Sequence, residues 1–236
     1  MLNLLTVSIF TACGDKQDTA SAEPTTEPSS EASTEPSIEP SSEASTEPST
    51  EPPPPPPELM NGGFEDDGGM WNFFPTTALN YEFVSTGDGI YDPTIGEAST
   101  DVLFTAAEGS KSIKMWTEQT LYSYQEFTGF AEGDSISFSG KAFVSAIDPI
   151  GGENTFGQLL IKAYGENYSE LAAGVSTILI DSTTTADEWR DLSAELVVPA
   201  GTVQVQIGVE IVVGSNPVGA LYFDDLQMTY SGGMTQ

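Results

Sequence analysis

The side chains that could do chemistry in this chain are carboxylates, amides, hydroxyls and aromatic rings. The sequence contains no histidine and only six lysine and arginine residues. Histidine bases, Ser-His-Asp triads and histidine-ligated zinc are therefore excluded. The 36 acidic residues give a formal net charge of −30, which repels phosphate backbones and anionic lipid headgroups. Nucleic acid is accordingly excluded as a partner.

Three segments place such side chains at every second position, as the polar face of a half-buried β-strand does. They are Gln158, Lys162 and Tyr164 in the first, Gln204, Gln206 and Glu210 in the second, and Tyr122, Tyr124 and Glu126 in the third. Flat aromatic rings suit the apolar faces of sugar rings, and amides and carboxylates suit their hydroxyl groups. These faces carry the groups that a sugar-binding surface needs; the alternative is that they are solvent-facing residues partly covered by loops.

The strands that must position these side chains follow from the period-two alternation of apolar residues in 59–236. The alternation is clearest from Val203 to Ile211 and from Ile136 to Val144, and further strands are expected at 82–85, 102–106, 111–116, 121–128, 158–164, 176–181, 190–198 and 219–230. No helix longer than a turn or two is expected. The pattern predicts an all-β fold, a two-sheet antiparallel β-sandwich of jelly-roll type over 59–231, with a flexible tail at 232–236.

The first residues, 1–12, are a short apolar run that ends in small residues before Cys13, the only cysteine of the chain. This pattern resembles a bacterial lipoprotein signal, in which cleavage before the cysteine leaves a lipid-carrying N-terminus. The resemblance implies an exported protein held to a membrane of the bacterial cell envelope, or at the outer surface, through a lipid anchor on Cys13. The alternative is an apolar N-terminal segment with a buried thiol.

Residues 13–58 are of low complexity, and the segment EPSSEASTEPS that begins at Glu27 recurs from Glu39. Frequent prolines remove backbone donors and forbid a helix, while self-repelling glutamates without apolar residues predict an extended, disordered linker. The six prolines Pro52 to Pro57 stiffen its last part. A proline-rich docking motif is the alternative, disfavoured because no Arg or Lys flanks these prolines.

Five segments of 59–231 resemble, in order, the carbohydrate-binding modules of the family 4/9 group, which are galactose-binding-like jelly rolls. They are LMNGGFE at 59–65 followed by Trp71, then 109–115, 133–139 and 189–199, and finally ALYFDDLQM at 220–228. The resemblance implies a non-catalytic module with a binding cleft on its concave sheet. Gln206 and Glu210 match the amide positions of the family, and Phe74 matches a stacking aromatic. Glu210 stands where an amide is more usual, which leaves the identity of the ligand open.

Glu65 and Asp224 belong to the first and last strands of the expected sandwich, which lie close together in a jelly roll. The part from 59 to 236 has a net charge of −20, so two converging carboxylates repel each other unless a cation lies between them. Calcium suits such oxygen ligands. The resemblance implies the same structural calcium, with main-chain carbonyl ligands from Gly63 and from the turn at Ser110 and Lys111. Alternatively, both carboxylates are solvated or accept backbone hydrogen bonds.

Together these features predict a surface lipoprotein that captures polysaccharide without altering it. The negative charge favours neutral glycans over uronate-rich or sulfated ones. Two other functions stay open. One is a surface adhesin or structural protein that binds another protein, since a fold does not specify its ligand. The other is a glycoside hydrolase with two carboxylates, for which Glu126 and Glu210 are the nearest candidates.

Overall fold

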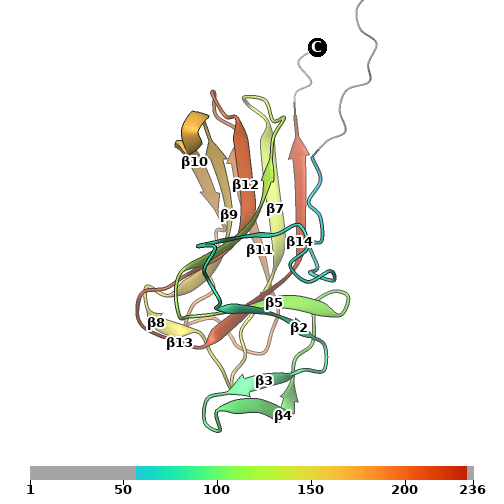
Figure 1. Cartoon of the computed structure of the whole chain (residues 1–236), viewed down its shortest axis with the longest axis vertical. Coiled ribbons are helices and arrows are strands. Elements are labelled where there is room, and N and C mark those ends of the chain that lie inside the picture. The colour runs from blue at the N-terminus through green and yellow to red at the C-terminus, as the bar shows by residue number, and fades with distance from the viewer. Residues whose placement is uncertain (1–56, 233–236) are drawn as a thin grey trace, which may run out of the picture. The chain divides into compact units, whose positions relative to one another are not determined.

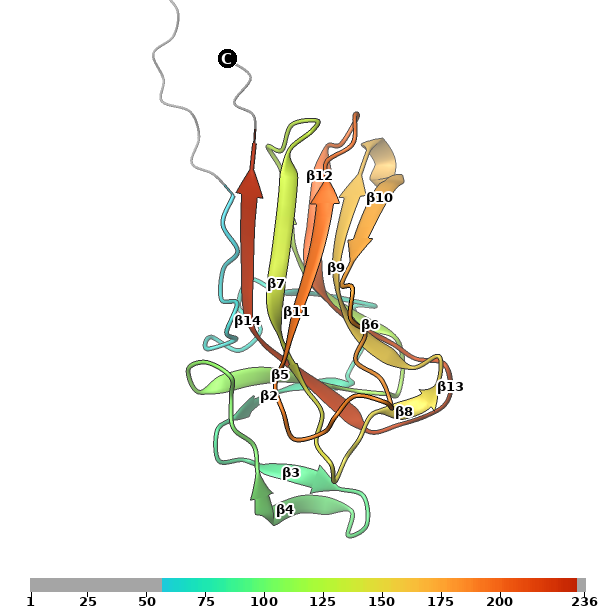
Figure 2. The same ribbon diagram turned by 180° about the vertical axis from the view of Figure 1, so that it is seen from behind.

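Two antiparallel sheets of five strands form the sandwich in the computed structural model, which describes residues 57–232 (Figures 1 and 2). Sheet A has the order β1 (Asn72–Phe74), β6 (Leu121–Phe127), β12 (Gln204–Val212), β9 (Phe156–Tyr164) and β10 (Glu170–Val175). Sheet B has the order β11 (Arg190–Val197), β7 (Ser135–Phe143), β14 (Ala220–Ser231), β5 (Lys111–Trp116) and β2 (Tyr81–Ser85). The all-β sandwich expected from the sequence is confirmed.

One hairpin, one further two-stranded sheet and one helical turn complete the described elements. β3 (Gly89–Asp92) pairs with β4 (Glu97–Leu103), β8 (Gly151–Glu153) pairs with β13 (Ser215–Val218), and η1 spans Glu166–Tyr168. Figures 1 and 2 place the β3–β4 hairpin at the end of the molecule where β2 and β5 lie. Within residues 57–232, no helix has the length and apolar character needed to cross a membrane.

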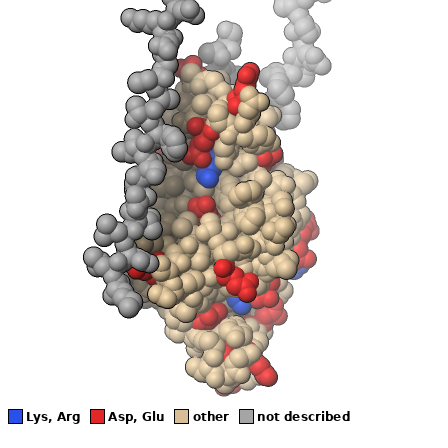
Figure 3. All heavy atoms as spheres, turned by 60° about the vertical axis from the view of Figure 1, so that its left-hand side comes forward, with Lys and Arg blue, Asp and Glu red and all other residues tan. Residues whose placement is uncertain are grey.

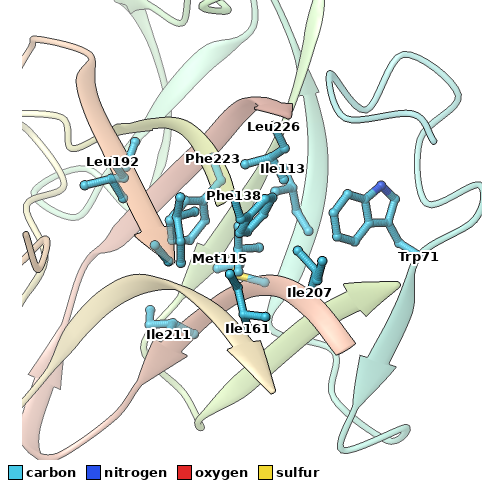
Figure 4. Packing of buried hydrophobic residues seen from close by; sticks show 14 of the residues in the cluster. Trp71, Ile113, Met115, Phe138, Ile161, Leu192, Ile207, Ile211, Phe223 and Leu226 are labelled. Carbon is cyan, nitrogen blue, oxygen red and sulfur yellow. The ribbon is translucent and has the colours of Figure 1, made fainter. Parts of the chain in front are cut away.

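The core lies between the sheets and is built from the apolar half of each alternating strand. Val205, Ile207 and Ile211 of β12 are fully buried, as is Phe138 of β7. Figure 4 shows side chains of both sheets meeting in this interior. Because successive side chains of a strand point to opposite faces, burying one set of β12 turns the other set outward. The amide and carboxylate side chains of β12 are thereby directed away from the core.

The two ends of the described domain meet, as the sequence predicted, but Glu65 lies in a run of turns and not in a first strand, because β1 begins only at Asn72 and belongs to sheet A. Phe64 and Phe223 are both fully buried in the same cluster. The amide of Leu226 in β14 donates to the carbonyl of Gly62 at 3.1 Å. A Cβ atom on Gly62 would collide with the main-chain carbonyl of Leu226, so only glycine permits this close approach.

The strand predicted at 176–181 is wrong, and β10 occupies 170–175 instead. The Ser176 hydroxyl accepts a hydrogen bond from the amide of Leu159 at 3.2 Å and donates to the carbonyl of Ile178 at 2.8 Å. Such local side-chain bonds compete with strand pairing, and only Ile180 forms a bridge, to Gly157.

The strand predicted at 102–106 is shifted, because β4 ends at Leu103 and the buried Phe104 follows it. The short strands β1, β3, β8 and β13 were not predicted. The expected signal segment with Cys13, the linker up to residue 56 and the tail from 233 lie outside the described residues.

Candidate functional site

The outward face of sheet A brings together the ten residues that the sequence singled out as candidates for carbohydrate binding. We call it the polar face of sheet A. It carries Phe74 from β1, Tyr122, Tyr124 and Glu126 from β6, Gln204, Gln206 and Glu210 from β12, and Gln158, Lys162 and Tyr164 from β9. The strand register orders them in cross-strand rows, one of which is Phe74, Tyr122, Glu210 and Gln158. Residues distant in sequence thus become neighbours.

Two amide–carboxylate pairs fix the polar centre of this face. Nε2 of Gln158 donates to Oε2 of Glu210 at 2.6 Å, and Nε2 of Gln206 donates to Oε1 of Glu126 at 2.8 Å. Each amide keeps a carbonyl oxygen and a second N–H, and each carboxylate keeps a second oxygen. Each pair therefore still offers both donors and acceptors, while its own hydrogen bond restricts the side chains to one geometry.

Aromatic rings and one ammonium group surround these pairs. The rings of Tyr122 and Tyr124 stack with centroids 4.9 Å apart, and Nζ of Lys162 lies 5.4 Å from the centroid of the Tyr122 ring. Phe74 is 64% exposed at the edge of the sheet. At the opposite edge, Tyr168 of η1 lies edge-on to Tyr164 at 6.0 Å. The sequence reasoning missed Tyr168 because it lies in a turn and not in an alternating strand.

Two buried polar atoms on or beside this face have no partner among residues 57–232. They are the hydroxyl oxygen of Tyr122 and Nε2 of Gln204. Burial, followed by the nearby Tyr164 and Glu210, raises the pKa of Tyr122 well above its usual value, so its hydroxyl stays a hydrogen-bond donor. Leaving such a group unsatisfied costs about 1–3 kcal/mol. Both atoms therefore favour a ligand or solvent that supplies a hydrogen-bond partner.

Glu126 and Glu210, the carboxylates considered for glycoside hydrolysis, lie on different rows of the polar face. Glu126 lies opposite Gln206, which is four residues from Glu210 along β12. At about 3.3 Å per residue, the main chains at Glu126 and Glu210 are therefore about 13 Å apart. Each carboxylate is also held by a different amide. Hydrolases of this kind place the two carboxyl groups about 5 to 9.5 Å apart.

Asp224 is fully buried and receives several hydrogen bonds from the segment before β5. Its Oδ2 accepts bonds from the amides of Ala107 at 2.7 Å and Glu108 at 3.1 Å, and from the Ser112 hydroxyl at 2.9 Å. Burial raises the pKa of Asp224, and these donors oppose the rise. A buried charge needs such donors to be tolerated. This carboxylate therefore joins β14 to the 107–112 segment.

Glu65 binds the same segment from the other side. Its Oε1 accepts bonds from the amides of Ser110 at 2.8 Å and Lys111 at 3.0 Å, and its Oε2 accepts one from the Ser110 hydroxyl at 2.7 Å. The bonds from Ser110, followed by that from Lys111, lower the pKa of Glu65. Nζ of Lys111 forms an ion pair with Asp67 at 2.7 Å. The turn thus presents N–H groups to Glu65, where the sequence reasoning expected carbonyl oxygens.

The residues expected to hold calcium do lie at one end of the sandwich. A Cβ built on Gly63 would be 3.8 Å from Oδ1 of Asp224 and 3.9 Å from Cγ of Glu65, so both side chains approach this glycine. A side-chain hydrogen bond with Asp225, followed by the charges of Asp225 and Asp224, raises the pKa of the neighbouring Glu108. Within residues 57–232, no three acidic, cysteine or histidine side chains are placed to hold a metal. Any ion here would need main-chain oxygens and water as further ligands.

The charge of the described domain is carried mainly by scattered acidic side chains. Figure 3 shows acidic groups over one face of the molecule with few lysine or arginine groups among them. Lysine side chains pair with acids, as Lys141 does with Asp191 at 3.0 Å and Lys162 with Glu170 at 3.8 Å. The surface is therefore unsuited to polyanionic partners.

No protein-family model matches the chain, and no curated protein resembles it significantly. Among solved structures it is similar to the enzymatically active domain of tailspike protein 4 of bacteriophage CBA120, at 11% identity and TM-score 0.48 over 73% of this chain and 21% of that one. TmCBM61 in complex with beta-1,4-galactotriose is 15% identical, with TM-score 0.45 over 73% of this chain and 97% of that one. The CBM22-1 xylan-binding domain from Paenibacillus barcinonensis Xyn10C is 11% identical, with TM-score 0.44 over 69% of this chain and 86% of that one. At these values the likeness concerns the sandwich and assigns no ligand.

The hydrogen bonds of Glu65 predict a pH-dependent contribution to stability. Because the pKa of Glu65 is lowered from 4.5 on folding, its stabilising effect is present above that value and lost as the pH falls through the folded-state pKa. Glu65→Gln keeps one acceptor oxygen for the amides of Ser110 and Lys111, replaces the other with an NH2 group and removes the charge. We expect a lower melting temperature than wild type at pH 7 and a difference that shrinks below pH 4.5.

Melts of both proteins from pH 7 to pH 3, recorded with EDTA present, measure this difference without any contribution from bound metal. Asp101→Asn is the control, since Asp101 lies in the exposed β4 and its side chain accepts no bond among the described residues. A difference between wild type and Glu65→Gln that stays constant with pH contradicts the argument.

Proposed function

We propose that this protein binds polysaccharide on the polar face of sheet A and does not cleave it. The observation that carries the proposal is the pairing of Gln158 with Glu210 and of Gln206 with Glu126 between aromatic side chains. Side chains already held in place lose little conformational entropy on binding. A sugar ring needs both features at once, namely apolar stacking surface and hydrogen-bonding groups at its edge.

The arrangement suits a chain of sugars better than one isolated ring. Successive rows are two residues apart, about 6.6 Å along the strands, and Phe74 and Tyr164 lie on different rows at opposite edges of the face. The unpartnered hydroxyl of Tyr122 lies in the same row as Phe74. Sugar hydroxyls would satisfy it. The resemblance of the two ends of the domain to the family 4/9 modules supports the same proposal.

The charge of the molecule further limits the ligand. The 25 acidic and five basic residues of 59–236 repel uronate-rich and sulfated polymers. The proposed ligand is therefore a neutral glycan such as β-glucan or xylan. An adhesin that binds another protein remains the alternative, and it predicts no retention by glycans.

Removing one stacking and one hydrogen-bonding side chain should abolish glycan binding. We expect wild type to be retarded in native gels that contain soluble β-glucan or xylan, and the combined variant Phe74→Ala, Gln206→Ala to migrate as in a gel without glycan. The melting temperature of this variant should stay close to wild type, because Phe74 is 64% exposed and Gln206, although 7% exposed, lies on the outer face of sheet A and not in the core between the sheets.

The matched control makes the same kinds of change on sheet B. Val197 is 63% exposed, and Gln227 is exposed and donates to Asp225 at 2.7 Å. The combined variant Val197→Ala, Gln227→Ala should keep wild-type retention. Equal loss in both double variants, or full retention in the first, would place binding elsewhere. No retention of wild type by any neutral glycan would favour the adhesin.

We also propose that calcium binds at the end of the sandwich near Gly63. Glu65 and Asp224 would supply carboxylate oxygens, and the carbonyl of Gly63 and water would supply others. The support is the gathering of carboxylates that raises the pKa of Glu108, since a cation would relieve their repulsion. The hydrogen bonds to Glu65 and Asp224 are the alternative means of holding this end together.

Chelation separates these two explanations. If calcium contributes, EDTA should lower the melting temperature by several degrees, and excess CaCl₂ should restore it while MgCl₂ restores less, because Mg²⁺ demands a tighter octahedral shell. A melting temperature that EDTA leaves unchanged would remove calcium and leave the hydrogen bonds as the sole connection.

We propose, from the sequence alone, that a lipid on Cys13 anchors the chain at the bacterial envelope after export. Expression of the full chain in a bacterium should place wild type in the membrane fraction, because the acyl chains partition into the bilayer. Cys13→Ser should move it to the soluble fraction, whereas Ser8→Ala, a change of similar size within the apolar run, should not. Membrane association that survives Cys13→Ser would exclude the anchor.

A further inference from the structure

A second candidate site lies on the other sheet, remote from the polar face of sheet A. It is a cavity of about 460 Å³, within the size range of small-molecule sites. We call it the hairpin pocket. Its lining includes Tyr91 from β3, Glu82 from β2, Lys114 and Trp116 from β5, and Glu118 and Asp148 from connecting segments. The β3–β4 hairpin, which lies at this end of the molecule in Figures 1 and 2, supplies the outer aromatic.

Asp148 places a buried carboxylate in the wall of this pocket. It is only 6% exposed, and no hydrogen bond or ion pair involves its carboxylate among residues 57–232. Burial raises the pKa of Asp148, and the charge of Lys114 opposes the rise without a direct contact. A buried carboxylate without donors is costly, and this one lines an open cavity. It is therefore suited to accept hydrogen bonds from a ligand.

The remaining walls combine one cation with two aromatic rings. Nζ of Lys114 pairs with Glu82 at 3.0 Å and lies 5.9 Å from the ring centroids of both Tyr91 and Trp116. The indole N–H of Trp116 points to Glu118 at 3.3 Å. Lys114 is itself buried and so fixed in place. The pocket thus offers acceptors, a donor and apolar ring faces within one enclosure.

These features select the chemical class of the ligand. Three carboxylates against one lysine disfavour an anion. The ammonium of Lys114 already lies near both rings and repels a second cation from them. A neutral ring with several hydroxyl groups carries neither an unfavourable negative nor an unfavourable positive charge. Its vicinal hydroxyls can donate to a carboxylate, and its C–H face can pack on an aromatic ring. The volume suits one or two such rings and not an extended chain.

We propose that the hairpin pocket binds a single neutral sugar unit, with Asp148 as the acceptor of its hydroxyl groups and Trp116 or Tyr91 as the stacking surface. This proposal goes beyond polysaccharide binding on sheet A and does not depend on it.

The test is a tryptophan-fluorescence titration of the full chain with the methyl glycosides of glucose, galactose, mannose and xylose. Trp116 lies in the pocket, whereas Trp71 is buried in the core. We expect a saturable change with at least one glycoside, and no response to glucuronate. The response should disappear in Trp116→Phe. No saturable response to any of the four glycosides would overturn the proposal.

Two variants locate the binding. Asp148→Asn should weaken the glycoside at least tenfold, whereas the sheet A double variant Phe74→Ala, Gln206→Ala should bind it as wild type does. The reverse pattern, with loss in the sheet A variant and retention in Asp148→Asn, would overturn the hairpin pocket and assign the sugar to sheet A.

If Asp148→Asn does not fold, Glu118→Gln provides the second variant. Glu118 is exposed at the rim and bonded to Trp116, so its replacement should leave the melt unchanged and weaken the glycoside a few-fold. An unchanged affinity in Glu118→Gln then counts against the proposal. Because gel retention reports sheet A and fluorescence reports Trp116, either site can fail while the other stands.

Discussion

The buried carboxylate of Asp224 is the constraint on which the sandwich depends. It lies on β14, the strand that pairs with both β5 and β7, and it accepts bonds from Ala107, Glu108 and Ser112. A charge taken out of water must be surrounded by donors, so the segment before β5 is held against the last strand. Glu65 fastens the first segment to the same turn. The ends of the domain are thereby joined beside sheet B.

Strand alternation turns the side chains of sheet A alternately toward the core and toward the outer face. One set, such as Ile207 and Ile161, fills the core. The other set faces outward, where antiparallel register places amides opposite carboxylates. A sheet holds these groups more rigidly than loops would, which is what a binding surface needs. The same rigidity holds Glu126 and Glu210 on different rows, each in a hydrogen bond with its own amide.

The outer face of sheet B differs from that of sheet A because the β3–β4 hairpin covers part of it. Ile90 of β3 and Phe104 after β4 pack with Tyr222 of β14 in a small second cluster. Beside that cluster the hairpin leaves a cavity and does not seal the sheet. Lys114 and Asp148, which an ordinary outer face would expose to water, are therefore enclosed. Enclosure makes their interactions with a ligand stronger than they would be at an open surface.

The sequence by itself determined the strands with strict alternation, including β7, β9 and β12, because one buried face imposes a period of two on apolar residues. It also named nine residues of the polar face, since polar positions on such strands share one side, and the family resemblance added Phe74. It did not predict β3 or β10 and misplaced β4, because the residues of these strands are mostly polar or small and partly exposed. Only the tertiary structure decided that amides of Ser110 and Lys111 face Glu65. It alone assembled the hairpin pocket, because its residues come from separate segments that no local pattern connects.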